Sequence, residues 1–265
     1  MNKMKKEKFT GILNKQVLKF KNNKDLEKYY ENKYKSGGYK GGYILHGINF
    51  SNIYHKERQK SALNFLSPAK NEVILDVGCG NGKVSLRVAK RAKIVYGVDI
   101  AKSALKNIKK KPKNLIFRRM NIENLRFRQD FFDKIVCVET LEHVLNPKKA
   151  IKELRRVLKR DGYLVLTYPT VNTTIIKKIE IKIGITKNFP VSEHLTEWDY
   201  DRLIDEMRKS GFKLISAKGV VFDLGKLGMI REISKWVAKT TVNIQLKIRK
   251  FPRNSSFITL KFQKV

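Results

Sequence analysis

The stretch Val73-Ile74-Leu75-Asp76-Val77-Gly78-Cys79-Gly80-Asn81-Gly82 decides the fold of this 265-residue chain. Its first five residues are apolar except for Asp76, which is typical of a buried strand, and three glycines follow at alternate positions. Glycine permits a turn whose backbone approaches a ligand closely, and the start of the next helix offers unpaired N–H groups to a carboxylate or phosphate. The stretch therefore predicts a strand, a ligand-binding turn and a helix.

Strand and helix patterns alternate along the rest of the chain, which predicts an α/β fold with a Rossmann-like, doubly wound sheet of about seven strands and helices on both faces. We expect strands at residues 73–77, 94–98, 114–118, 134–138, 163–167, 212–217 and 257–262. We expect helices at residues 52–66, 83–91, 102–110, 147–159 and 196–209, the last opened by a capping box at Thr196. A turn is expected at Asp161-Gly162.

We divide the chain into two parts. Residues 1–50 are expected to form a basic N-terminal helical arm, with apolar positions from Ile12 to Phe20 at helical spacing, followed by a Gly-rich loop. Residues 51–265 are expected to form the α/β domain. Within it, residues 171–188 and 226–250 look like amphipathic insertions beyond strand ends, where lids or surface elements belong.

The composition is strongly basic. The 58 Lys and Arg residues exceed the 24 Asp and Glu residues and give a formal charge of +34, which attracts nucleic acid, an anionic membrane or an acidic small substrate. An evenly lysine-rich, solvated surface explains the charge equally well. Only two cysteines occur, and no apolar run is long enough for a membrane-spanning helix. We therefore expect a cytoplasmic protein, with peripheral membrane contact as an open alternative.

The glycine spacing bears on the ligand. A dinucleotide fingerprint, Gly-x-Gly-x-x-Gly, would need glycine where Lys83 stands, and here a Gly-x-Gly-x-Gly pattern follows Asp76 instead. Asp99 ends the second expected strand, 19 residues after Gly80, and is placed for its carboxylate to bind both hydroxyls of a ribose.

Three motifs carry a family resemblance. Residues 73–82, Tyr96-Gly97-Val98-Asp99, and residues 132–144 (FDKIVCVETLEHV) resemble the class I S-adenosylmethionine methyltransferases, and specifically the ubiquinone and menaquinone ring (type 11) branch. The similarity covers about residues 55–220. It implies a sheet whose last strand is antiparallel and S-adenosylmethionine as the cofactor. It leaves open whether the acceptor is a small molecule or a lipid, and whether oxygen or carbon is methylated.

The resemblance also assigns residues to the cofactor. Gly78 and Gly80 would border its methionine part, Asp99 its ribose, and Val138 and Glu139 its sulfonium. Asn121 stands where the family usually has an acidic residue, and its amide oxygen can still accept from the adenine amino group. The full predicted cofactor set is Asp76, Gly78, Cys79, Gly80, Gly82, Asp99, Ile100, Asn121, Ile122, Val138 and Glu139.

Methyl transfer is an in-line displacement, so the protein contributes mainly alignment and exclusion of water. A hydroxyl acceptor also needs a base, for which His143 and His194 are the candidates. If residues 139–143 are helical, Glu139, Glu142 and His143 share one face and can bind a divalent metal such as Mg²⁺. The alternative is that Glu142 and His143 only hydrogen-bond the loop after the fourth strand.

Other functions stay open at this point. The segment from Lys226 to Arg253 carries eight basic residues and one acidic residue, which suits either an interfacial helix on anionic lipid or a core-packing helix with a solvated back. An RNA methyltransferase would use the positive charge to hold phosphates, and a non-catalytic protein could keep the fold for binding alone. The oligomeric state lies beyond the sequence.

Overall fold

The computed structural model describes residues 18–37, 44–45, 48–106, 108, 111–170, 193–222, 235–247 and 252–265. The expected arm before residue 18, most of the Gly-rich loop, the insertion at 171–188 and the start of the second insertion lie outside these residues.

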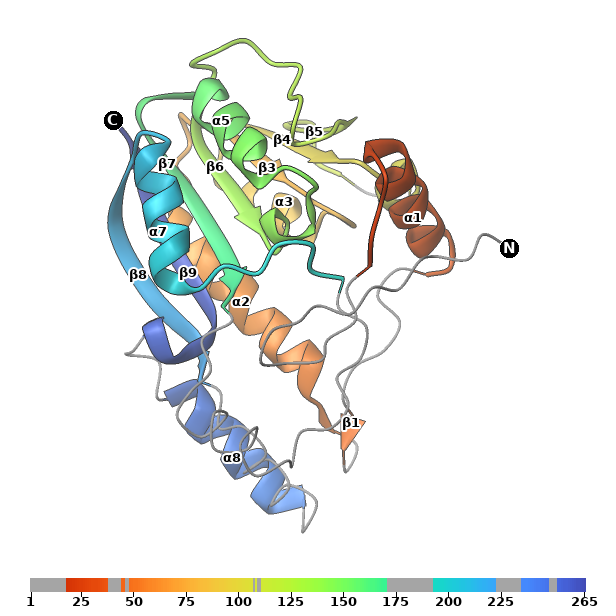
Figure 1. Ribbon diagram of the computed structural model, residues 1–265, viewed down its shortest axis with the longest axis vertical. Coiled ribbons are helices and arrows are strands. Elements are labelled where there is room, and N and C mark those ends of the chain that lie inside the picture. The colour runs from red at the N-terminus through yellow and green to blue at the C-terminus, as the bar shows by residue number, and fades with distance from the viewer. Residues whose placement is uncertain are drawn as a thin grey trace.

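A seven-stranded sheet forms the centre of the molecule, in the order β5-β4-β3-β6-β7-β9-β8 (Figure 1). Strands β3 to β7 run parallel, whereas β9 is antiparallel to both β7 and β8, as the sequence predicts. The strands are β3 (Val73–Val77), β4 (Ile94–Asp99), β5 (Leu115–Arg119), β6 (Phe132–Val138), β7 (Leu158–Pro169), β8 (Phe212–Phe222) and β9 (Ser255–Lys264). A separate small hairpin, β1 (Ile44–Leu45) with β2 (Ile48–Asn49), was not predicted.

Helices cover both faces of the sheet (Figure 1). They are α1 (Asn23–Lys35), α2 (Phe50–Leu66), α3 (Lys83–Val88), α4 (Lys102–Lys106), α5 (Pro147–Val157), α7 (Tyr200–Lys209) and α8 (Lys235–Lys247), with short 3-10 turns at Leu141–His143 and Pro252–Asn254. Helix α2 packs on β6, β7 and β9, α7 packs on β8, and α1 contacts α4. No helix among these described elements is both long and apolar enough to cross a bilayer.

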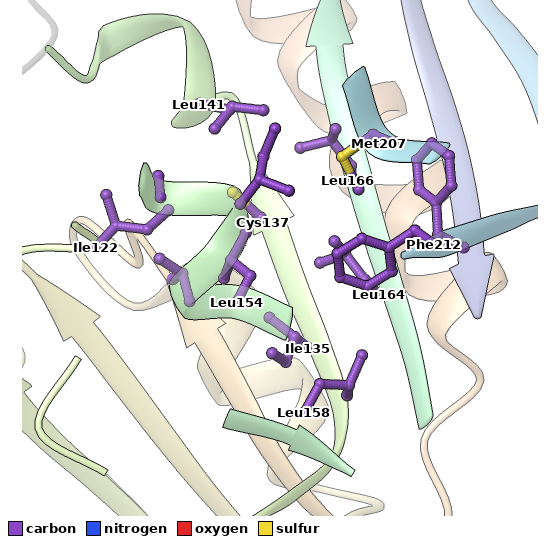
Figure 2. Close-up of a cluster of buried hydrophobic side chains, with 14 of the residues drawn as sticks. Ile122, Ile135, Cys137, Leu141, Leu154, Leu158, Leu164, Leu166, Met207 and Phe212 are labelled. Atoms are coloured by element: carbon purple, nitrogen blue, oxygen red, sulfur yellow. The ribbon is translucent and has the colours of Figure 1, made fainter. Parts of the chain in front are cut away.

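The core is split by the sheet into two layers because successive strand residues face opposite sides. On β6, Ile135 and Cys137 join one layer with α5 and α7 (Figure 2), whereas Val136 joins the other with α2 and α3. On β7, Leu164 and Leu166 likewise join the first layer, whereas Val165 joins the second. Burial on both faces explains why these strands are continuous apolar runs in the sequence.

Several expected boundaries are wrong. Helices α3, α4 and α5 end earlier than expected, and α7 is capped by Asp199, whose carboxylate accepts from the Arg202 N–H at 2.8 Å, and not by Thr196. The expected turn at Asp161-Gly162 is a bulge inside β7, where residues 159–162 lie opposite Asp133 alone.

The predicted N-terminal arm is described only from residue 18 onward, and it contains helix α1. Leu18 and Phe20 precede the helix, which starts at Asn23 after Asn22 caps it through the N–H groups of Lys24 and Asp25. The start of the helix follows from the Asn22 cap and not from the apolar spacing, since an Asn side chain satisfies the unpaired N–H groups of the first turn. Helix α1 then lies beyond the carboxyl ends of β3 and β4 (Figure 1), close to the candidate site.

Candidate active site

The glycine turn after β3 adopts backbone conformations that require glycine. Gly78 and Gly80 have φ angles of 68° and 51°, in the left-handed region. A Cβ atom at Gly78 would overlap the Thr140 side chain, and one at Gly80 would lie 2.7 Å from the Tyr34 hydroxyl. The Gly78 N–H donates to the Val98 carbonyl at 2.8 Å, which fixes the turn against β4. Glycine at these positions therefore lets Thr140 and Tyr34 pack directly against the backbone of the turn.

Two buried aspartates flank this turn. Asp99 ends β4 and accepts the Gly80 N–H at 2.8 Å through one carboxylate oxygen and the Ala101 N–H at 2.9 Å through the other. Each oxygen keeps a lone pair for a further donor. Asp76 lies beneath the turn, fully buried, and accepts from the Ser85 hydroxyl at 2.5 Å. Burial raises the pKa of both carboxyls, that of Asp76 to about 7.

A cavity opens above the turn, at the carboxyl ends of β3, β4 and β6. Ligands of open α/β sheets bind at this edge. Its lining is mostly apolar, with a few polar groups, and consists of Leu26, Tyr30, Tyr34, Val77, Gly78, Val98, Asp99, Ile100, Met120, Asn121, Ile122, Glu139, Thr140, His143 and Val144.

The predicted cofactor residues divide into two groups. The cavity wall includes Gly78, Asp99, Ile100, Asn121, Ile122 and Glu139. The others support the wall from behind: Asp76 and Cys79 are buried, Gly80 holds Asp99, Gly82 caps α3, and Val138 ends β6. The Asn121 side-chain oxygen already accepts the Glu123 N–H at 2.8 Å, which leaves one lone pair for a further donor.

Residues on α1 were missed by sequence reasoning. Leu26, Tyr30 and Tyr34 are spaced four residues apart, so they share one helix face, and that face lines the cavity. The spacing was visible in the sequence and predicts a helix with one apolar, aromatic face. Nothing local to residues 23–35 indicates that this face covers the glycine turn.

Glu139 follows β6 and is held by a cation. Its φ angle is 50°, so the helix assumed for residues 139–143 does not begin here, and the 3-10 turn covers only Leu141–His143. Its carboxylate forms an ion pair with Arg58 of α2, whose guanidinium lies 4.0 Å from the centre of the Phe257 ring. Burial alone would raise the pKa of Glu139, but the Arg58 charge, together with the His55 hydrogen bond and the nearby His55 and His143 rings, holds the pKa below its ordinary value. Glu139 therefore presents a compensated negative charge.

Glu142 is fully buried, and neither carboxylate oxygen has a hydrogen-bond partner among the described residues. Burial first, and then the nearby Glu139 charge, raise its pKa well above the ordinary value. Its main-chain carbonyl accepts from the N–H groups of Leu195 and Thr196, which joins the 3-10 turn to the segment before α7.

His143 and His194 lie side by side, with ring centres 5.0 Å apart. The His143 Nδ1 lies 3.0 Å from the main-chain oxygen of Glu193, so the proton is on Nδ1 and Nε2 carries a free lone pair. Burial lowers the pKa of His143, which keeps the ring neutral. The ligand atoms of Glu142, His143 and His194 lie within 4.8 Å of one another. The expected one-faced trio with Glu139 is thus replaced by a grouping with His194, because residues 139–143 are not one helix.

Taken together, the sheet order with its antiparallel β9, the glycine turn after β3 and the acidic end of β4 define a class I methyltransferase fold. The methyltransferase-domain family matches residues 75–166. The ubiquinone biosynthesis O-methyltransferase of Histophilus somni is 30% identical over 172 residues, covering 60% of this chain and 67% of that protein. Its counterpart in Rickettsia prowazekii is 29% identical over 223 residues, covering 77% and 83% respectively.

Solved structures agree on the fold. A Thermotoga maritima S-adenosylmethionine-dependent methyltransferase, described as a possible histamine N-methyltransferase, aligns with a TM-score of 0.58 at 18% identity, over 91% of this chain and 99% of its own. The chain belongs to the class I S-adenosylmethionine-dependent methyltransferases. It is an enzyme of that class, and its cofactor is S-adenosylmethionine.

Proposed function

We propose that this enzyme methylates a hydroxyl group on a small or lipid-like aromatic acceptor, with His143 as the base. The observation that carries the proposal is the hydrogen bond from His143 Nδ1 to the Glu193 carbonyl, because it leaves Nε2 as a proton acceptor in the cavity wall. Only an acceptor that loses a proton during the reaction, such as a phenol, needs this group. The ubiquinone biosynthesis O-methyltransferases to which the chain is similar support an aromatic hydroxyl acceptor.

The surroundings of His143 suit a planar ring. Tyr30 of α1 lies edge-on to His143, with ring centres 6.1 Å apart, and His194 lies edge-on from another side. Aromatic rings prefer such edge-to-face contacts with other rings. Leu26 and Val144 add apolar surface to the same cavity.

The residues have separable tasks in this proposal. S-adenosylmethionine, when bound, supplies the methyl group and carries a positive charge at sulfur. Gly78 and Asp99 hold the cofactor, while Glu139, fixed by its ion pair with Arg58, forms the cavity wall at the end of β6. His143 takes the acceptor proton at Nε2, and its Nδ1 bond to Glu193 supports the imidazolium that forms. Helix α1 excludes water from above.

The alternative is that the Nε2 lone pair of His143 binds a divalent cation such as Mg²⁺ and takes no proton. The residues fit a cation, since the unpartnered, buried oxygens of Glu142 lie beside the ring nitrogens of His143 and His194. Glu139 does not join them, because Arg58 already neutralises its charge. A bound cation would orient a phenolate oxygen toward the cavity. Full activity in excess chelator excludes this alternative and leaves His143 as the base.

A lipid-like acceptor would also give α8 a role. Trp236 is 74% exposed and Ile244 is 43% exposed on this helix, and Lys239 and Lys247 are exposed beside them. An exposed aromatic flanked by basic residues suits contact with an anionic membrane surface. We include this peripheral contact in the proposal.

The test is a methyl-transfer screen with radiolabelled S-adenosylmethionine. The acceptors are a panel of simple phenols and catechols, a total lipid extract and total small RNA, each with and without Mg²⁺ and chelator. The proposal expects label in the phenols or the lipid fraction, and loss of that label in Asp99→Ala. Label in RNA alone would instead support the RNA methyltransferase that the basic composition allows.

A further inference from the structure

Tyr34 reaches over the glycine turn from the last turn of α1. Its hydroxyl lies 2.7 Å from the position that a Cβ atom would take at Gly80, which places it directly against the backbone of the turn. The side chain is part of the cavity wall, together with Gly78 and Asp99. Tyr34 therefore belongs to the same surface as the residues that hold the cofactor, although it lies more than 40 positions earlier in the chain.

The hydroxyl of Tyr34 is poised to bond a ligand. Burial, and next the nearby Asp99 charge, raise the pKa of Tyr34, so the group stays a protonated donor. The described residues offer it no hydrogen-bond partner. A hydroxyl half-buried in a cavity wall without a protein acceptor loses its bonds to water when a ligand binds, unless the ligand replaces them.

The position of Tyr34 is fixed by contacts along α1. The Glu31 carboxylate accepts the Ser103 N–H at 3.0 Å, and the Ser103 hydroxyl donates to the Glu31 carbonyl at 2.9 Å. Lys33 forms an ion pair with Glu193, and the Tyr29 hydroxyl donates to the same carboxylate at 2.9 Å. Helix α1 is thus tied to both sides of the cavity, which reduces the entropy that Tyr34 would lose on binding a ligand.

We propose that the Tyr34 hydroxyl hydrogen-bonds the ribose hydroxyls of S-adenosylmethionine alongside Asp99, so that α1 forms part of the cofactor site. Asp99 accepts from a ribose, and its two oxygens keep one lone pair each. The Tyr34 hydroxyl lies against Gly80, whose N–H donates to Asp99, so both side chains line the same part of the cavity and Tyr34 can donate to a ribose oxygen. The inference depends on the cofactor of the family and is independent of the acceptor.

The test compares Tyr34→Phe with the unchanged chain by calorimetric titration of two ligands. S-adenosylhomocysteine contains both the ribose and the amino-acid part, whereas methylthioadenosine contains the ribose but lacks the amino acid. Loss of one neutral hydrogen bond predicts a Kd about fivefold higher for both ligands. Tyr163→Phe is the matched control: Lys261 Nζ lies 4.2 Å from the centre of the Tyr163 ring, within β7 and outside the cavity lining, so both Kd values should stay unchanged.

A second variant distinguishes a weakened Tyr34 contact from a general loss of folding. Glu31→Ala keeps the Tyr34 hydroxyl but removes the carboxylate that ties α1 to Ser103, so the hydroxyl is held less firmly and both ligands should bind more weakly while thermal unfolding stays cooperative. Unchanged Kd values in Tyr34→Phe would overturn the proposal. Weakening of S-adenosylhomocysteine alone would also overturn it, because the hydroxyl would then act on the amino-acid part.

Discussion

The Nδ1 atom of His143 lies 3.0 Å from the main-chain oxygen of Glu193, and the side chain of Glu193 is bound by Lys33 and Tyr29 of α1. One residue thus sets the tautomer of the proposed base through its backbone and holds the helix above the cavity through its carboxylate. The closing helix and the proposed base are therefore coupled through a single position.

The proposed base gives the first prediction. His143→Gln should lower kcat by roughly 10² to 10⁴, because a positioned proton acceptor contributes about that factor. The Kd for S-adenosylhomocysteine should change less than twofold, as the glycine turn and Asp99 are untouched. Steady-state kinetics with the best phenol from the screen, together with calorimetry, make the comparison. An unchanged kcat would remove His143 from this role.

The Arg58–Glu139 pair predicts a stability effect. Arg58→Met leaves the largely buried Glu139 carboxylate without its Arg58 partner, and breaking such a pair costs up to about 3 kcal/mol. The double variant Arg58→Met/Glu139→Gln should recover at least half of that loss, because no unpaired charge remains. Urea unfolding of the two single variants and the double variant measures the coupling. Additive losses would contradict a direct interaction.

Asp76 predicts a pH dependence of stability. Its pKa is about 7 in the folded protein and about 4 in the unfolded chain, so between these pH values the folded protein binds more protons. The free energy of unfolding therefore falls as pH rises toward 7, by up to about 1.4 kcal/mol per pH unit for this group, and falls no further above it.

The matching experiment is urea unfolding of the ligand-free protein from pH 5 to 8. Asp76→Asn should make the slope shallower, although burial of Asp99 and Glu142 leaves part of it. Asp201→Asn changes an exposed carboxyl and should reproduce the original slope. Equal slopes in all three proteins would show that Asp76 titrates normally.

A side chain at position 78 should clash with Thr140, and a second substitution at Thr140 should relieve the clash. Gly78→Ala places a methyl group inside the Thr140 side chain and forces a left-handed conformation that costs about 1 to 2 kcal/mol. Cofactor affinity and stability should both fall. Thr140→Gly in the same chain removes the overlap but not the conformational cost, so it should restore stability only in part. Complete restoration would mean that the φ angle carries no strain.

The exposed side of α8 predicts membrane binding. Wild-type protein should float with vesicles that contain anionic phospholipid and stay behind with purely zwitterionic vesicles, because basic residues attract the negative surface. Trp236→Ala should reduce flotation several-fold, while Ile215→Ala, another exposed apolar side chain but on β8, should not. Equal flotation of both variants would show that α8 does not carry the membrane binding.

Much of the fold followed from the sequence. The apolar runs around Val73, Ile94 and Lys134 mark strands buried on both faces, and Gly78 and Asp99 mark the edge of the sheet where the cavity lies. These features are local, so a short window of sequence contains them. Boundaries were less accurate because the bulge at residues 159–162 and the cap at Asp199 depend on neighbouring strands and turns.

The contacts that bring distant residues together in the site could not be predicted from short windows of sequence. The contact of Tyr34 with the glycine turn and the pairing of Glu139 with Arg58 join residues that are distant in the chain. His194 comes beside His143 only because the Glu142 carbonyl holds Leu195 and Thr196. Spacing within one motif suggested that Glu139, Glu142 and His143 share one helical face, but the left-handed backbone at Glu139 excludes a helix there.

The central claim is transfer of the methyl group to oxygen, and carbon-13 NMR tests it most directly. The enzyme is incubated with S-adenosylmethionine labelled with ¹³C in the methyl group and with the lipid and phenol fractions, and the shift of the product methyl is read. The proposal predicts a methyl carbon bonded to oxygen, lost in His143→Gln. A methyl carbon bonded to a ring carbon or to nitrogen would contradict it.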